Sequence, residues 1–310
     1  RWSGIAAQEL GLAGRPVTRQ AMLALAQGFA PGDGRELCQN AGAKPTIKPK
    51  THRLTGEPVL DANGQPIMVS EGGHRVGFDL TYTPPKPVSV AFAMAEGEQR
   101  DQIVEAHRRA VDRAMAWLES RVETRRGHAG KDVIGVSALI YSQHDHLANR
   151  DLEPNLHTHT LIYGVAKGDD GQWGTFDPIE IYRHRRAADA MYQSELAREL
   201  RQLGYGITHK REFDANNEAT GRMIWGIAGV SDELCQRFST RRQEILDYQA
   251  EHGVDAQKAC LATRRHKDEP SFAEMREAWS KAMALMKERD PALVIDAKEL
   301  LGREGRTETP

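Results

Sequence analysis

Two long β-prone runs, separated by a short polar loop, limit the fold of this chain more than any other feature. The runs cover residues 133–141 (VIGVSALIY) and 156–165 (LHTHTLIYGV), both rich in the β-branched and aromatic residues that favour strands. The loop between them contains Asn149, Asp151 and Pro154, which favour a turn. The two runs are therefore expected to pair as neighbouring antiparallel strands of one sheet.

Helical patterns lie on both sides of this strand pair. Apolar or small residues recur at three- and four-residue spacing, and such amphipathic helices need a sheet or another helix to pack on. Residues 76–83 alternate like a strand before a proline-rich break, and residues 212–227 have the turn chemistry of a hairpin. We expect helices at residues 88–95, 99–124, 187–203, 231–252 and 271–288.

The composition predicts a folded, soluble chain. The 310 residues are 39% hydrophobic and 28% charged, which suits one large or two modest domains. No run approaches the roughly 20 apolar residues of a membrane span, and the start at Arg1 is neither an initiator methionine nor a signal peptide. The three cysteines are far apart and form no CxxC pair, which favours a reducing cytoplasm. We therefore expect an excised fragment of a cytoplasmic protein, which the family resemblance described below implies is bacterial.

A polar insertion precedes residue 76. Residues 31–76 are rich in Gly, Pro, Asn and Lys, and residues 58–67 carry a hairpin-like turn, so an exposed arm is expected. The formal net charge is -2, yet basic side chains cluster locally, either as nucleic-acid contacts or as plain solvated surface. The clusters are Lys44, Lys48, Lys50, His52 and Arg53; Arg121, Arg125, Arg126 and Lys131; Arg183, His184, Arg185 and Arg186; and Arg264, Arg265, His266 and Lys267.

Three histidines on the paired runs are candidate metal ligands. His157 and His159 are two apart in a strand, so their imidazoles project from one face while Thr158 faces the other way. An antiparallel return can bring His146, just past the end of the preceding strand, beside this pair. His144 alternates with His146 in the same way, and spacing alone does not choose between them. The alternative is that these are ordinary strand histidines that bind no metal.

A site with three histidine ligands would keep coordination positions open, as catalytic metal sites do. Because imidazoles are neutral, a divalent ion would keep its full positive charge and favour an anionic ligand such as a phosphodiester. Metal affinity is expected to fall at acidic pH, since the imidazoles must be neutral to bind.

Five motifs carry a family resemblance across most of residues 1–290. They are RWSG with ELGL within residues 1–12, GFDLTYTPPKPVS at 77–89, EPNLHTH at 153–159, GQW at 171–173, and the helix with its GY end at 192–205. Together they resemble the F-type (MobF) conjugative relaxases, the TraI/TrwC group of HUH endonucleases. The family correspondence places the first metal histidine at His146, eleven residues before His157, and not at His144.

The resemblance implies a fold and a domain plan. The fold would be α+β, with a ferredoxin-like antiparallel sheet (the HUH palm) backed by helices, and helical fingers toward the C-terminus. On this basis we expect the palm at residues 1–230, the fingers at 231–300, and a linker at 301–310 toward a helicase region of the full protein. An arm at about 41–70 is inserted in the palm and is longer than the family usually has.

The resemblance also implies roles for residues outside the histidine cluster. Asp79 matches an acidic residue beside the metal ligands, which would fix an imidazole tautomer or help to deprotonate the nucleophile. Its alternative is a strand-end aspartate that binds backbone. Lys86 and Arg150 lie in matching motifs and are candidate phosphate contacts, with an exposed or salt-bridged role as the alternative.

The implied activity is strand-specific nicking and rejoining of single-stranded DNA at a conjugative transfer origin, by metal-assisted transesterification with a tyrosine. Family tyrosines precede the equivalent of Trp2, so we expect the nucleophile upstream of Arg1, an inactive fragment without it, and Tyr192 in the core. Mg²⁺ or Mn²⁺ is the expected metal, although Zn²⁺, Ni²⁺ or Cu²⁺ would bind three imidazoles more tightly in vitro. Implied partners are hairpin origin DNA, relaxosome accessory proteins and a coupling protein, with the chain a monomer.

Three other functions fit parts of the pattern. A rolling-circle initiator or transposase of the HUH class would need Tyr192 as its nucleophile, although the following Lys of that motif is replaced by Glu195. A DNA-binding module that does not cleave would bind its hairpin regardless of chelators. A histidine-metal hydrolase of small phosphoesters would need an activated water and no tyrosine.

Overall fold

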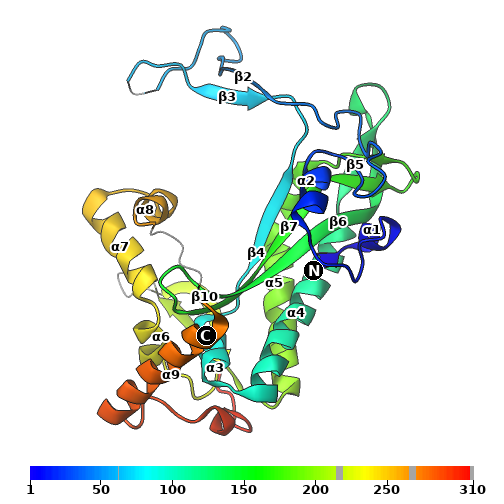
Figure 1. Ribbon diagram of the computed structural model, residues 1–310. Helices are drawn as coiled ribbons and strands as arrows, with labels where there is room; N and C mark the ends of the chain where they lie inside the picture. Colours follow the sequence, from blue (N-terminus) through cyan, green and yellow to red (C-terminus); the bar gives the residue numbers. More distant parts are fainter. Residues whose placement is uncertain (62, 214–218, 265–269, 308–310) are drawn as a thin grey trace. The chain divides into compact units, whose positions relative to one another are not determined.

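The two β-prone runs form neighbouring strands of one sheet. In the computed structural model, which describes residues 1–61, 63–213, 219–264 and 270–307, β6 spans Asp132–Ala148 and β7 spans Pro154–Gly168. Among the described residues the sheet has the order β1-β6-β7-β4, with β5 paired to β6 and β8 to β7 (Figure 1). The predicted α+β class with an antiparallel sheet is confirmed. The other strands of this sheet are β1 (Trp2–Ser3), β4 (Gly77–Tyr82), β5 (Glu123–Arg126) and β8 (Trp173–Gly174).

The predicted helices are present, but their bounds differ and three short helices have no predicted counterpart. The helix predicted over 187–203 begins earlier, at Pro178, where the Asp177 carboxylate accepts from the Ile179 backbone N–H. The predicted helix over 99–124 ends at Glu119, because Thr124 pairs with Ile134 in the sheet. The predicted helix over 231–252 is two helices, since the chain turns at Phe238, which is buried. The α-helices are α1 (Ile5–Glu9), α2 (Arg19–Ala26), α3 (Lys86–Met94), α4 (Gly97–Glu119), α5 (Pro178–Gln202), α6 (Asp232–Arg237), α7 (Thr240–His252), α8 (Ala256–Ala262) and α9 (Phe272–Arg289). Short 3-10 helices lie at His128–Gly130 and Ala297–Leu300.

The chain folds as two compact units, each assembled from separate stretches of sequence. Unit 1 comprises residues 1–80, 115–144 and 160–188, and unit 2 comprises residues 81–114, 145–159 and 189–310. The domain plan of a palm over 1–230 and fingers over 231–300 stays a prediction.

The core of unit 1 forms where the N-terminal segment packs on the sheet. Trp2 pairs with β6 and lies 5.8 Å from Tyr163 between ring centroids, within a buried apolar cluster that includes Leu25 and Ile140. Gly4 follows with φ +88°, and a Cβ there would lie 2.3 Å from a backbone oxygen of β6. Only glycine fits such a close approach, so the turn from β1 into α1 depends on it.

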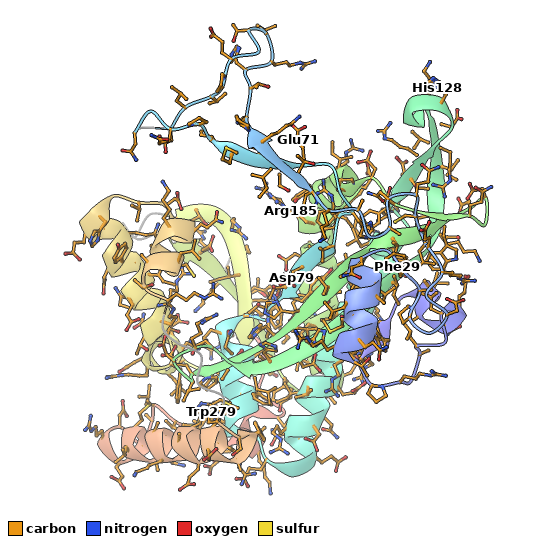
Figure 2. All side chains as sticks on the ribbon, turned by 45° about the horizontal axis from the view of Figure 1, so that its top comes forward. Phe29, Glu71, Asp79, His128, Arg185 and Trp279 are labelled. Carbon is orange, nitrogen blue, oxygen red and sulfur yellow. The ribbon has the colours of Figure 1, made fainter. Side chains whose placement is uncertain are left out.

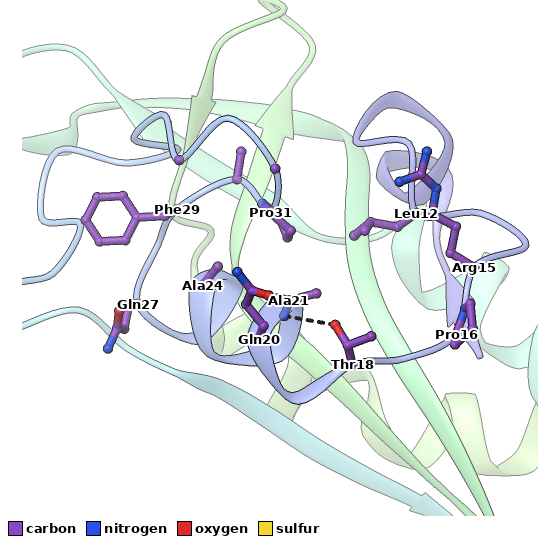
Figure 3. Close-up of a pocket in the computed structure, with 13 residues that line it drawn as sticks. Leu12, Arg15, Pro16, Thr18, Gln20, Ala21, Ala24, Gln27, Phe29 and Pro31 are labelled. Carbon is purple, nitrogen blue, oxygen red and sulfur yellow. Dashed lines mark hydrogen bonds between the residues drawn. The ribbon is translucent and has the colours of Figure 1, made fainter.

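A pocket of 510 Å³ opens beside α2 in unit 1 (Figure 3). Leu12, Phe29 and Pro31 supply part of its apolar lining. Thr18 caps the helix next to it, because its hydroxyl accepts a hydrogen bond from the Ala21 backbone N–H at 3.2 Å. None of the predicted site residues lines this pocket.

The core of unit 2 joins two helices to a hairpin. Phe92 of α3 lies 6.1 Å from Trp279 of α9 between ring centroids, with their planes nearly perpendicular. The predicted hairpin is confirmed as β9 (Ile207–Phe213) paired antiparallel with β10 (Ala219–Ile227). Within the predicted linker, Leu301 forms a β-bridge with Tyr205, and the Arg306 backbone oxygen accepts from His209 of β9 at 2.8 Å. Residues 308–310 lie outside the described residues.

The inserted arm forms a separate two-stranded ribbon. Its strands are β2 (Thr46–Pro49) and β3 (Met68–Glu71), which pair antiparallel. Within the described part of the chain, no helix combines the length and apolar composition that crossing a membrane requires.

Candidate metal centre

Three histidines from neighbouring strands face one point in unit 2. His146 on β6 and His157 and His159 on β7 each offer a ring nitrogen, and these nitrogens all lie within 4.8 Å of one another. The ring centroids form an almost regular triangle, with separations of 5.0, 5.1 and 5.2 Å. Small rotations of the rings about their side-chain bonds would bring three nitrogens onto one ion, at the roughly 2 Å typical of a metal–imidazole bond.

The alternation of β7 produces this arrangement. His157 and His159 are half-buried, whereas Leu156, Thr158 and Thr160 between and beside them are buried. Successive side chains of a strand point to opposite faces, so the two imidazoles share the outer face as the sequence predicts.

His146 lies inside a strand, and its expected place just past a strand end is wrong. The run predicted to end at residue 141 continues to Ala148, because β6 and β7 are joined by the short turn at residues 149–153 and so pair as neighbours down to it. The histidine cluster contains His146 and not His144, whose Nε2 lies 3.0 Å from the Ser142 hydroxyl.

Hydrogen bonds at Nδ1 decide which nitrogen His157 presents. Its Nδ1 lies 2.8 Å from the backbone oxygen of Asn155, and a carbonyl can only accept, so Nδ1 carries the proton and donates it. The lone pair is then on Nε2, which is the nitrogen that would bind a metal ion. Such a carbonyl partner is the usual way in which proteins orient a metal-binding imidazole.

Thr81 of β4 contacts the corresponding nitrogen of His159 with a hydroxyl, which can accept as well as donate. Its Oγ1 lies 3.1 Å from His159 Nδ1, and donation from Nδ1–H to this hydroxyl leaves Nε2 for a metal. The sequence pattern does not single out Thr81 or Asn155. Both lie in motifs of the family resemblance, but only the pairing of β4 with β7 connects Thr81 to a histidine far along the chain.

A buried hydrogen-bonded chain holds the inner face of the ligand strands. The Thr158 hydroxyl donates to Asp145 at 2.6 Å and lies 2.8 Å from His107 Nε2. His107 is fully buried, and its Nδ1 accepts a hydrogen bond from the Tyr192 hydroxyl at 2.9 Å. Asp145 also accepts from Arg108 at 2.7 Å. These bonds link α4 and α5 to the residues beside each ligand.

These hydrogen bonds stabilise the ionised form of Asp145. Burial disfavours the ionised carboxyl, but the hydrogen bonds from Thr158 and Arg108 outweigh burial and hold its pKa below the ordinary range. The aspartate next to His146 is therefore ionised at neutral pH.

Tyr192 belongs to the core, as predicted. It has no exposed surface, and its ring packs on Tyr82 at 5.3 Å between centroids. Burial, with a smaller contribution from the charge of Asp189, raises the pKa of Tyr192 well above its ordinary value. A nucleophile needs access to its substrate, so this position argues against the rolling-circle alternative.

The turn that joins the ligand strands is held on several sides. The Glu153 carboxylate accepts from both the backbone N–H and the hydroxyl of Thr240, each at 2.7 Å. Trp279 donates its indole N–H to the backbone oxygen of Leu152 at 2.6 Å. Leu152 has φ +61°, a left-handed conformation that costs about 1–2 kcal/mol for a non-glycine residue. Contacts from α7 and α9 help to maintain it.

The predicted DNA contacts Lys86 and Arg150 both lie at this turn. Lys86 is half-buried and donates to the backbone oxygen of Pro154 at 2.8 Å, so it fixes the start of β7. Burial lowers the pKa of Lys86, while the charge of Glu153 opposes that shift. Arg150 is half-buried within the turn.

Asp79 is an exposed residue of β4 (Figure 2). It stands two residues before Thr81, so the two side chains leave the same face of the strand. Its catalytic role stays a prediction.

Comparisons with known proteins agree with this fold. The model of the TrwC relaxase family matches residues 1–286. The multifunctional conjugation protein TraI of Escherichia coli is 29% identical over 280 residues, which are 86% of this chain and 13% of that protein. The chain therefore spans a small part of the length of this curated relative.

Two solved structures are similar over nearly the whole chain. TrwC complexed with a 27-mer DNA comprising the recognition hairpin and the cleavage site has a TM-score of 0.70 and 26% identity, covering 92% of this chain and 90% of that one. A metal-bound structure of the conjugative relaxase TrwC in complex with OriT DNA has a TM-score of 0.67 and 27% identity, covering 96% and 88%. Fold and sequence together define a conjugative relaxase domain. The chain belongs to the TrwC relaxase family.

Proposed function

We propose that this chain forms the part of a relaxase that nicks and rejoins one DNA strand at a conjugative transfer origin. The observation that carries the proposal is the triangle of His146, His157 and His159 within a chain matched by the TrwC family. One TrwC structure is a complex with a 27-mer DNA comprising the recognition hairpin and the cleavage site, and another is a complex with OriT DNA. The proposed substrate is DNA of that kind. Relaxosome accessory proteins and a coupling protein are the proposed protein partners.

The three histidines suit a divalent metal ion. Two of them have Nδ1 engaged by Asn155 or Thr81, which aims Nε2 at the common point. A bound cation would supply positive charge to the scissile phosphate. Mg²⁺ or Mn²⁺ is the proposed ion from phosphoryl chemistry and cellular supply, and the metal-bound TrwC structure supports a metal of some kind.

The proposed nucleophile is a tyrosine on a segment upstream of Arg1. Five of the seven tyrosines here are buried, and Tyr192, the one that a rolling-circle mechanism requires, is among them. In the proposed step a phenolate oxygen attacks the scissile phosphorus. The bond to the 3′-oxygen breaks, that oxygen takes up a proton, and the 5′-phosphate stays on the tyrosine. The reverse step rejoins the strand.

Asp79 is proposed to accept a proton or a hydrogen bond close to the attacking hydroxyl, which its exposed carboxylate can do. Lys86 and Arg150 are proposed to contact phosphates. Lys86 would also have a structural role, because its hydrogen bond to Pro154 holds the start of the strand that carries His157.

Covalent capture tests the reaction. The chain is expressed with the tyrosine segment that we place upstream of Arg1, and is mixed with Mn²⁺ and single-stranded fragments of the replicon that carries the gene. The expected product is a protein–DNA adduct that survives denaturation and disappears after protease treatment. It should form only with the segment present, and chelator should abolish it.

Two variants separate the alternatives. Tyr182, which is 55% exposed, is replaced by Phe, and so is the buried Tyr192. Loss of the adduct in either variant would place the nucleophile within these 310 residues and overturn the upstream assignment. Hairpin binding with no adduct under any condition would support a DNA-binding module that does not cleave.

A further inference from the structure

A hydrogen bond between side chains of β6 and β7 lies on the inner face of the sheet, opposite the histidine triangle. Asp145 precedes His146 on β6, and Thr158 lies between the two histidines of β7. Side chains alternate along a strand, so Asp145 and Thr158 both point away from the face that carries the imidazoles. The Thr158 hydroxyl lies 2.6 Å from the Asp145 carboxylate. The two ligand strands are therefore tied to each other at the level of the three histidines.

The chemistry of Asp145 fixes the direction of the hydrogen bonds around Thr158. A carboxylate only accepts, so the Thr158 hydroxyl donates to Asp145. The Thr158 oxygen then accepts from His107 Nε2 at 2.8 Å. With the proton of a neutral imidazole on Nε2, the lone pair of Nδ1 accepts from the Tyr192 hydroxyl at 2.9 Å. Thr158 thus uses its donor and its acceptor at once, each in one fixed sense.

Two consecutive residues of α4 hold the two members of this cross-strand pair. His107 donates to Thr158, and Arg108 donates to Asp145 at 2.7 Å. His107 and Thr158 are buried, with exposed fractions of 0% and 1%. A buried polar group that loses its partner is costly, because no water replaces the lost bond. A shift of one ligand strand against the other would break such a bond, and α4 therefore helps to fix their pairing.

Thr160 provides an internal comparison on the same strand. It is the next inner-face residue of β7 and is also fully buried. Its hydroxyl has no hydrogen-bond partner within the part of the chain that the structure describes. The same residue type on the same face is thus bonded twice at position 158 and left unbonded two residues further on. The bonding belongs to the position behind the metal ligands, and is not a general property of buried threonines in this strand.

We infer that Thr158 is a positioning residue of the metal centre, which sets the place of His146 relative to the two histidines of β7. His157 and His159 share one strand and keep their spacing however that strand is paired. His146 comes from the neighbouring strand, so its distance from them depends on how β6 and β7 pair. Three imidazoles bind one ion only when each nitrogen reaches it at about 2 Å. The inference rests on the metal site of the proposed function, but needs neither DNA nor cleavage.

Mn²⁺ titration of Thr158→Val tests the inference. Valine has nearly the same volume but neither donates to Asp145 nor accepts from His107. Outer partners of metal ligands contribute about 10- to 100-fold in affinity, and we expect a loss of about tenfold because Thr158 acts through the strands. Thr158→Ser keeps the hydroxyl and should recover most of the affinity. Thr158→Ala, which also lacks the hydroxyl but adds no bulk, should repeat the loss and decides the question if the valine variant does not fold.

Thr160→Val is the matched control in this titration. It makes the same change on the same face of the same strand, at a hydroxyl without a hydrogen-bond partner in the described structure. Its Mn²⁺ affinity should equal that of the wild type.

The visible absorption spectrum of bound Co²⁺ separates positioning from a loss of stability. This spectrum depends on the geometry of the ligands around the ion, and it is recorded at saturating Co²⁺, where every folded variant is fully loaded. Thr158→Val should alter the spectrum, and Thr158→Ser should restore it. A residue that only stabilised the fold would lower the unfolding temperature and leave the spectrum of the loaded protein unchanged.

Three results would overturn the inference: wild-type affinity and spectrum in Thr158→Val, an equal loss in Thr160→Val, or a wild type that binds no Mn²⁺, which would remove the metal site as well. Covalent capture of DNA is run on the same samples. If capture fails in the wild type while Thr158→Val still weakens Mn²⁺ binding, the proposed reaction is wrong and the positioning role stands. If the wild type binds Mn²⁺ and forms the adduct, and Thr158→Val binds Mn²⁺ equally well, only the positioning role fails.

Discussion

At the scale of single residues, hydrogen bonds at Nδ1 orient two of the three imidazoles of the site, those of His157 and His159. Alternation alone predicts that His157 and His159 share a face. It does not predict that Asn155 and Thr81 hold these rings through Nδ1, because Thr81 reaches His159 only through the pairing of strands distant in sequence. The choice of His146 over His144 likewise required the family correspondence, and the structure gives the same grouping.

Thr81→Val should weaken metal binding. Valine keeps the shape of threonine but cannot accept from His159 Nδ1, so the ring loses its orientation. Outer partners of this kind contribute about 10- to 100-fold in metal affinity, and we expect a loss of about tenfold in an Mn²⁺ titration.

Thr160→Val is the matched control for that substitution. The Thr160 hydroxyl is buried and has no hydrogen-bond partner among the described residues, so valine should leave metal affinity unchanged and leave stability equal or higher. Equal metal affinity in Thr81→Val and wild type would refute the tautomer argument.

Tyr192→Phe should lower stability without affecting strand cleavage. The variant removes the hydroxyl that bonds His107, at a cost of about 1 kcal/mol in the free energy of unfolding. Denaturant unfolding measures the first effect and adduct formation the second. A stable variant that forms no adduct would instead identify Tyr192 as the nucleophile.

At the scale of elements, the sequence predicts the presence of the long strands and helices better than their ends. The run predicted to stop at residue 141 continues through Gln143, His144 and Asp145, because antiparallel pairing satisfies the backbone whatever the local propensity. The helix predicted to reach residue 124 stops at Glu119, where the carboxylate accepts from the Ile5 and Leu139 backbone N–H groups. A local sequence pattern does not predict such tertiary hydrogen bonds.

Glu119→Gln should change how stability depends on pH. Burial raises the pKa of Glu119, and the hydrogen bonds from Leu139 and Ile5 only partly oppose this. A carboxyl with a raised folded-state pKa contributes stability below its unfolded pKa, and this contribution is lost as pH rises through the folded value. Glutamine keeps an acceptor oxygen but does not titrate.

The free energy of unfolding of the wild type should therefore fall relative to that of Glu119→Gln as pH rises above about 4, the ordinary glutamate value. Urea unfolding from pH 4 to 7 measures the difference. If the free energy of unfolding depends on pH in the same way in both proteins, ionisation of Glu119 does not destabilise the fold.

At the scale of the whole molecule, the family resemblance predicted more than local patterns could. The α+β class and the relaxase family follow from motifs near Asp79, His157 and Tyr192, and the structure and comparisons agree. The division into two units of interleaved segments could not be predicted, because it depends on contacts between distant stretches. The exposed ribbon of the arm was predicted only as a polar insertion, since its strands pair with each other and cover no core.

The central claim is that His146, His157 and His159 bind one divalent metal ion, and calorimetric titration of Mn²⁺ tests it most directly. Wild type should bind one equivalent, while His146→Ala and His157→Ala should lose binding, since two imidazoles remain. His144→Ala, two residues along the same strand, should bind like the wild type. Binding that survives both ligand substitutions, or that is lost in His144→Ala, would contradict the account.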